Sequence, residues 1–171
     1  LEKNARESSV RKELEKSDVA HFATHYVADE RSPMLSVLPL AGEKSPASKK
    51  GDGVLQTLEF YDMNLSRLRL VVLSACQTGI ERYYKGEGAV GLARPFQAAG
   101  IPLVVASLWP VESYPTKELM VGFHRRRKSS GLSTVRALRQ AQLEMIRSSN
   151  PELRNPYHWA AYIVIGGRAD Y

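Results

Sequence analysis

The chain has 171 residues, enough for one well-buried domain and too few for two of ordinary size. Its hydrophobic fraction of 43% and charged fraction of 25% are typical of globular proteins, and no apolar run approaches the roughly 18 residues of a membrane-spanning helix. The single cysteine, Cys76, excludes an internal disulfide and a cysteine-based metal site, and it fits a reducing, cytoplasmic environment.

The first third of the chain is predicted to hold one helix, one strand and a long irregular segment. Residues 3–16 are rich in charge and carry Val10 and Leu14 at helical spacing, which predicts a surface helix. Residues 19–23 (VAHFA) predict a short buried strand. Residues 26–53 have the composition of a loop, and a loop of this length is usually functional or disordered. We expect this loop to be a candidate for self-cleavage, because it contains the basic residues Arg31, Lys44, Lys49 and Lys50.

The middle of the chain alternates helices with strands. A short helix is predicted over 58–65, and the apolar runs 68–75 (LRLVVLSA) and 101–109 (IPLVVASLW) predict two buried strands. Between these strands, residues 87–100 predict a helix that Gly100 terminates. The face of this helix that we expect to be buried consists of Ala89, Leu92, Ala93 and Phe96.

The last third is predicted to contain two helices and a final strand, over 115–128, 133–148 and 158–166. Ser133 is a candidate N-cap of the second helix. The residues at helical spacing on that helix are Val135, Leu138, Gln142 and Met145. The predicted strands are apolar throughout and alternate with helices, which favours an α/β domain with a parallel sheet covered on both faces.

The net charge of +6 is partly concentrated in residues 124–131 (HRRRKSSG). One interpretation is a solvated helix C-terminus, where cationic side chains offset the negative end of the helix dipole. The alternative is a patch that binds nucleic acid, which would need a second basic cluster or interleaved aromatic residues. We favour the first interpretation and expect no direct binding of nucleic acid.

Two predicted strands end in residues that can carry out chemistry. One strand is followed by His25, and the other by Cys76. Because ligands of open parallel sheets bind beyond the carboxyl ends of the strands, neighbouring strands would bring these two side chains together. A thiol within reach of an imidazole is the arrangement that a cysteine nucleophile requires, and backbone N–H groups of the following Gln77–Gly79 turn could hold an oxyanion. The alternative is a buried structural cysteine beside a hydrogen-bonded core histidine.

The segment GEGAVG (86–91) satisfies the G-x-G-x-x-G pattern of dinucleotide-binding sites. Such a site requires the motif directly after a strand, whereas about ten residues separate it here from the predicted strand. We therefore expect these glycines to shape the loop that follows Cys76, and we expect no cofactor. His124 and His158 lack neighbours at metal-ligand spacing, so we interpret them as a surface residue and a cap near the last strand.

Seven segments resemble, in order, the motifs of the CHAT family, which are caspase-like cysteine proteases often fused to tetratricopeptide repeats. They are HFATH, LVVLSACQTG, GEGAVGLAR, AGIPLVVASLWPV, TKELMVGF, ALRQAQ and PYHWAAYIVIG, and the resemblance covers roughly residues 10–167. It implies an α/β fold: a caspase-like three-layer sandwich with a mostly parallel central sheet flanked by helices. It also implies a single domain over residues 1–171, which we expect to be the C-terminal part of a longer protein because the chain begins at Leu1.

The resemblance also implies the roles of particular residues. His25 matches the catalytic histidine that closes HFATH, Cys76 matches the nucleophile of SACQTG, and His21 matches a histidine with a structural role. The backbone N–H groups of Cys76 and Tyr26 would hold the oxyanion of a peptide substrate as a thioester forms. No metal or organic cofactor is implied.

Two residues depart from the family pattern. Tyr26 stands where glycine is usual after the catalytic histidine, and it reaches positive φ only at a cost of about 1 kcal/mol or more. Pro95 replaces an alanine-like residue in the helix, where we expect it to remove one backbone hydrogen bond and bend the helix. These departures are the best arguments for the alternative function, a caspase-like interaction or scaffold domain without catalytic activity.

The resemblance further suggests which residues contact the substrate. Ser74, two residues before Cys76, would line the pocket for the residue preceding the cut, and Trp109 is a second candidate. Because Ser74 is small and neutral, we expect a neutral or apolar pocket, unless a loop supplies a carboxylate from Asp29, Asp62 or Glu112. The sequence thus predicts a cysteine endopeptidase that acts on a protein substrate and is regulated by a partner or domain such as tetratricopeptide repeats.

Overall fold

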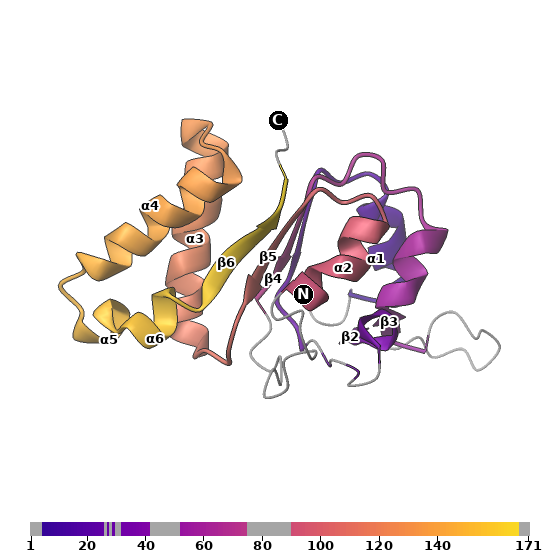
Figure 1. Cartoon of the computed structure of the whole chain (residues 1–171), viewed down its shortest axis with the longest axis horizontal. Helices are drawn as coiled ribbons and strands as arrows, with labels where there is room; N and C mark the ends of the chain where they lie inside the picture. Colours follow the sequence, from indigo (N-terminus) through magenta and orange to yellow (C-terminus); the bar gives the residue numbers. More distant parts are fainter. Residues whose placement is uncertain are drawn as a thin grey trace.

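The computed structural model describes residues 5–25, 27, 29, 32–41, 52–74 and 90–167. Within these ranges, a central sheet separates two layers of helices (Figure 1). Its strands are β1 (Val19–Phe22), β4 (Leu70–Leu73), β5 (Leu103–Ser107) and β6 (Tyr162–Gly166), in the order β1-β4-β5-β6. The first three strands are parallel and β6 is antiparallel to β5, so the prediction of a mostly parallel α/β sandwich is confirmed.

Helices cover both faces of the sheet (Figure 1). One layer holds α1 (Glu7–Leu14), α2 (Val90–Ala98) and the 3₁₀ helix η3 (Thr57–Asp62). The other holds α3 (Ser113–Ser130), α4 (Thr134–Ile146), α5 (Pro151–Arg154) and α6 (Pro156–Trp159). None of the helices in the described part of the chain combines the length and apolar character needed to cross a bilayer.

The central strands form because their residues are apolar on both faces, as expected for a parallel sheet covered on both sides. All residues of β4 and β5 are buried. Side chains alternate between the two layers, so Val71 and Leu73 belong to the core beneath α1 and α2. Leu70 and Val72 belong to the core beneath α3 and α4. Each layer therefore has its own hydrophobic core, and the sheet forms one wall of both.

A small antiparallel pair corrects the prediction that residues 26–53 are irregular. Residues Val37–Pro39 form β2 and pair with β3 (Val54–Gln56), and the 3₁₀ helix η2 (Pro33–Leu35) precedes β2. Leu38 and Leu55 are opposite each other in this pair and both are fully buried. Burial of these two leucines gives a short segment of loop-like composition a fixed place in the fold. The basic residues proposed for self-cleavage lie outside the described residues.

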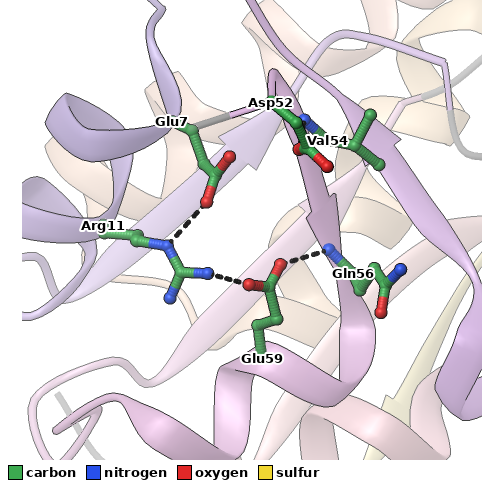
Figure 2. Close-up of polar contacts among 6 residues, drawn as sticks. All are labelled: Glu7, Arg11, Asp52, Val54, Gln56 and Glu59. Atoms are coloured by element: carbon green, nitrogen blue, oxygen red, sulfur yellow. Dashed lines mark hydrogen bonds and ion pairs between the residues drawn. The ribbon is translucent and has the colours of Figure 1, made fainter. Parts of the chain in front are cut away.

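The region of α1 and η3 is held together by charged side chains (Figure 2). The Arg11 guanidinium contacts the carboxylate of Glu7 on its own helix, at 3.0 Å, and that of Glu59 on η3. Glu59 also accepts a hydrogen bond from the backbone N–H of Gln56 at 2.8 Å, which closes the first turn of η3. Arg11 therefore fixes the predicted surface helix to the core-facing 3₁₀ helix.

The predicted helices are confirmed with several corrections to detail. Helix α2 continues through Pro95 to Ala98, and Gly100, with φ of 89°, follows its end as predicted. Ser133 precedes α4, but its side chain makes no capping hydrogen bond. Val135 is exposed because the buried face of α4 is rotated from the predicted one and consists of Thr134, Ala137, Leu138, Ala141 and Met145.

The last predicted strand begins four residues later than expected. Asn155 caps α6 by accepting a hydrogen bond from the N–H of Tyr157, and Pro156 occupies the first turn of that helix. His158 and Trp159 are therefore helical, and the strand starts at Tyr162. The apolar composition of HWAAY resembles a strand, but the Asn-Pro pair before it determines the local structure.

Candidate functional site

The carboxyl ends of β1 and β4 lie side by side. The strands pair in parallel with Phe22 opposite Leu73, and the N–H of Ser74 donates to the carbonyl of Phe22 at 3.1 Å. His25 follows the end of β1 and has an exposed side chain, and Ser74 directly follows β4 and is buried. The predicted dyad depends on these two strands being neighbours, and this condition is confirmed. Cys76 and Tyr26 lie outside the described residues.

A cleft of about 1050 Å³ opens at these strand ends, between β1 and helix α3. It is lined by His21, His25 and Ser74 from the strands and their ends, and by Pro39, Leu40 and Ala41 from the end of β2 and the chain after it. The opposite wall consists of Lys117, Met120, Val121 and His124, which face the cleft at helical spacing along α3. Apart from the histidines, Lys117 is the only described lining residue with a charged side chain. The described lining of the cleft is thus mostly neutral.

The chain that carries His25 is fixed on both sides of this residue. On one side, the Thr24 hydroxyl donates to the carbonyl of Pro39 at 2.8 Å. On the other, Val27 exchanges two backbone hydrogen bonds with Val37, both 2.9 Å. The β2 segment therefore acts as a support for His25. Sequence reasoning missed this support because β2 is short and lies within a segment of loop composition.

Three side chains form a hydrogen-bonded series that connects the two walls of the cleft. Nε2 of His21 lies 2.5 Å from Oγ of Ser74, and Nδ1 of His21 lies 3.1 Å from Nε2 of His124. The two imidazole rings have centroids 5.0 Å apart and are tilted by 35°. The series connects the end of β4, strand β1 and helix α3. His124 is half-buried, so its interpretation as a plain surface residue is wrong. The signal that could have found it is its helical spacing from Lys117 and Val121.

Both histidines of this series resist protonation. Although part of the His21 side chain is exposed in the cleft, desolvation of its ring, with a smaller contribution from the neighbouring His124, lowers its pKa from 6.5 to about 4. Burial and the positive charge of Arg127 lower the pKa of His124 as well. At neutral pH both rings are uncharged, so each ring can donate one hydrogen bond and accept one.

Acidification is expected to destabilise the fold through these histidines. Since the pKa of His21 is lower in the folded protein than in the unfolded one, the unfolded state binds more protons between pH 6.5 and about 4. Stability is therefore expected to fall as the pH decreases through this window. Urea unfolding at pH 7.5 and pH 5 measures this loss, and His21→Gln is expected to reduce it. An equal loss in the wild type and this variant would contradict the prediction.

The other predicted pocket residues lie apart from the cleft lining. Trp109 packs against the core beneath α3 and α4, and its Nε1 donates to the carbonyl of Tyr157 at 2.8 Å. Glu112 is the N-cap residue of α3, Asp62 ends η3, and Asp29 accepts a hydrogen bond from the N–H of Ser32. None of these side chains is among the described residues that line the cleft.

The remaining histidine, His158, and the basic cluster at the end of α3 make contacts that stabilise the fold. His158 is buried in α6 rather than at the last strand, and it packs edge-on against Tyr157. Arg125 and Arg126 of α3 both pair with Glu144 of α4. Gly131, with φ of 58°, ends α3 as expected for a basic helix C-terminus. Within the described ranges, no three His, Cys, Asp or Glu side chains are grouped so as to hold a metal ion.

Comparison with known proteins places this site in a family. The family model named CHAT domain matches residues 1–167. The chain is also 33% identical over 113 residues to tetratricopeptide repeat protein 28 of Mus musculus, and 31% identical to the protein of that name from Homo sapiens. Each match covers 66% of this chain but 4% of the relative, so the chain spans a small part of the length of these relatives. Because the family model matches nearly all of the sequence, the chain belongs to the CHAT domain family.

Proposed function

We propose that the chain is the catalytic domain of a cysteine endopeptidase with His25 and Cys76 as its dyad. The observation that carries the proposal is the parallel pairing of β1 with β4, since His25 follows one strand end and Cys76 comes two residues after Ser74 at the other. The cleft at these strand ends gives a protein substrate a place to bind.

In the proposed reaction, His25 removes the proton of the Cys76 thiol, and the thiolate attacks the peptide carbonyl carbon. The carbonyl oxygen takes up the negative charge and is held by the backbone N–H groups of Cys76 and Tyr26. When the C–N bond breaks, the imidazolium gives its proton to the leaving amine, and a thioester remains. Water, deprotonated by His25, then hydrolyses the thioester and regenerates the thiol.

The cleft lining supports a substrate with an uncharged residue before the cut. The side chains facing the cleft are mostly small, apolar or neutral. One of them, Ser74, lies just after the end of β4, two residues before Cys76 in the sequence. Lys117 stands on the opposite wall and would favour an acidic or polar group elsewhere on the substrate. Trp109 contacts the substrate only if the cleft extends beyond its described lining.

We further propose that the domain is regulated by tetratricopeptide repeats within a longer cytoplasmic protein. The support is the identity of the relatives, which are named tetratricopeptide repeat proteins and are far longer than the matched segment. Such repeats stack into extended surfaces that bind other proteins, and this would couple recognition of a partner to cleavage.

The decisive experiment is covalent labelling of Cys76 with a peptide acyloxymethyl ketone that carries an uncharged residue before the reactive group. We expect rapid formation of one adduct on Cys76, located by mass spectrometry, and none in Cys76→Ala. The same chain unfolded in urea is the control, because its thiol then reacts only at the intrinsic rate of a free cysteine. Equal rates in the folded and unfolded chains would contradict the proposal and favour the interaction or scaffold domain.

A further inference from the structure

The side-chain series Ser74–His21–His124 includes residues that lie close in sequence to both proposed dyad residues. Ser74 is two residues before Cys76, and His21 is four residues before His25. His124 approaches from α3, on the opposite wall of the cleft. The series therefore crosses between the two strands and anchors them to a helix, a few residues before the proposed dyad residues in the sequence.

The described backbone pairing between β1 and β4 extends as far as Ser74. The ladder between β1 and β4 ends with Phe22 opposite Leu73, and the N–H of Ser74 makes the last bond, to the carbonyl of Phe22. Among the described residues, the link between the two strand ends beyond this point is the contact of the Ser74 hydroxyl with Nε2 of His21. A residue of β1 can orient the chain just before Cys76 through this contact.

His21 can serve in this way because both of its ring nitrogens are engaged. Its Nδ1 contacts His124, which prevents the ring from turning, and its Nε2 then holds the serine hydroxyl in one direction. The lowered pKa of His21 keeps the ring neutral at pH 7, so it donates one of these two bonds and accepts the other.

We infer that His21 and His124 are positioning residues, which hold Ser74 and thereby orient the chain that carries Cys76 toward His25. This inference rests on the proposed function and assigns His21 a specific task beyond a general structural role. It predicts that loss of the Ser74 contact impairs the reaction of Cys76 with a bound peptide, because a displacement of about 1 Å can cost as much as 100-fold in rate. Binding of the peptide itself should change little.

Side-chain amides allow the two contacts of His21 to be tested separately. The amide of glutamine reaches the place of Nε2, so His21→Gln keeps the contact with Ser74 and loses the contact with His124. The amide of asparagine reaches the place of Nδ1, so His21→Asn does the opposite. For His124 the contact is through Nε2, so His124→Gln preserves the series and His124→Phe removes it.

The experiment measures kinact and KI for labelling of Cys76 in the full chain, with the peptide acyloxymethyl ketone described above. We expect kinact to fall about 10-fold in His21→Asn and by less in His21→Gln, with KI nearly unchanged. His124→Phe is expected to lower kinact, and His124→Gln to restore it. Arg125→Gln is the matched control, because this neighbour on α3 is exposed and faces α4 rather than the cleft.

Several results would overturn the inference. Equal kinact values in His21→Asn and His21→Gln would show that the contact with Ser74 is irrelevant, and an effect on KI alone would make His21 a binding residue.

Thermal unfolding of each variant identifies losses due to misfolding. If His21→Asn does not fold, the comparison of His124→Phe with His124→Gln tests the inference instead. Attachment of a fluorophosphonate to Ser74 would make the serine a nucleophile instead. If wild-type Cys76 shows no labelling dependent on His25, the proposed function itself fails, a result distinct from unchanged kinact in the variants.

Discussion

Replacing His25 with alanine is expected to slow labelling of Cys76 at pH 7 by about 10²–10⁴-fold, the range that a positioned acid or base contributes. The thiolate is the reactive species, and a free cysteine with a pKa near 8.5 is only a few per cent thiolate at neutral pH. An imidazole beside the thiol raises this fraction by accepting its proton. His25 lines the cleft just after the end of β1, and the neighbouring strand β4 ends at the same cleft with Ser74.

The measurement is the second-order rate constant for labelling as a function of pH. In the wild type, the rate is expected to reach its plateau below the ordinary pKa of a thiol, whereas in His25→Ala it should rise through a pKa of about 8.5. Val27→Ala is the matched control, because its side chain is exposed and its contacts with Val37 are through the backbone. A variant that labels as fast as the wild type at pH 7 would remove His25 from the mechanism.

Replacing Phe60 with alanine is expected to lower the free energy of unfolding by about 3–5 kcal/mol. Phe60 of η3 is fully buried between two other rings, with centroids 6.3 Å from Phe22 and 5.0 Å from Phe96, and both pairs pack edge to face. The truncated side chain would leave a cavity beneath β1. Urea unfolding followed by far-UV circular dichroism measures the loss.

A comparison within η3 separates burial from helix propensity in this prediction. Leu58 lies on the same 3₁₀ helix but is 47% exposed, so Leu58→Ala is expected to cost much less than Phe60→Ala. Because Phe22 is the last residue of β1, the cavity is also expected to reduce labelling of Cys76 by loosening the strand that leads to His25. Similar losses of stability in the two variants would show that the ring stack contributes little.

The parts of the fold that the sequence predicts are those whose local composition and burial agree. Strands β4 and β5 are continuous apolar runs, which only a sheet covered on both faces accommodates. The same reasoning predicted that His25 and Cys76 follow the ends of two strands, and these strands, β1 and β4, are neighbours in the sheet. The match of motifs in order then identified the family, which no single strand or helix specifies.

The parts that the sequence did not predict depend on contacts between distant residues. Strand β2 has three residues, one of them a proline, and its place is determined by burial of Leu38 against Leu55. The contact between His21 and His124 spans 103 positions, so neither residue signals it locally. In α4, apolar periodicity placed Val135 in the core, but packing against α3 buries Ala137 and Ala141 instead, which allows the two helices to approach closely.

The support of His25 by β2 distinguishes what the main chain determines at the cleft from what the side chains determine. The contacts that hold this segment are the backbone groups of Val27 and Val37 and the carbonyl of Pro39, and any residue other than proline at 27 and 37 offers the same groups. Side chains along this part of the cleft can therefore vary while the histidine keeps its location. If the proposed activity holds, the main chain here would set the geometry of the reaction, and substrate preference could diverge independently of it.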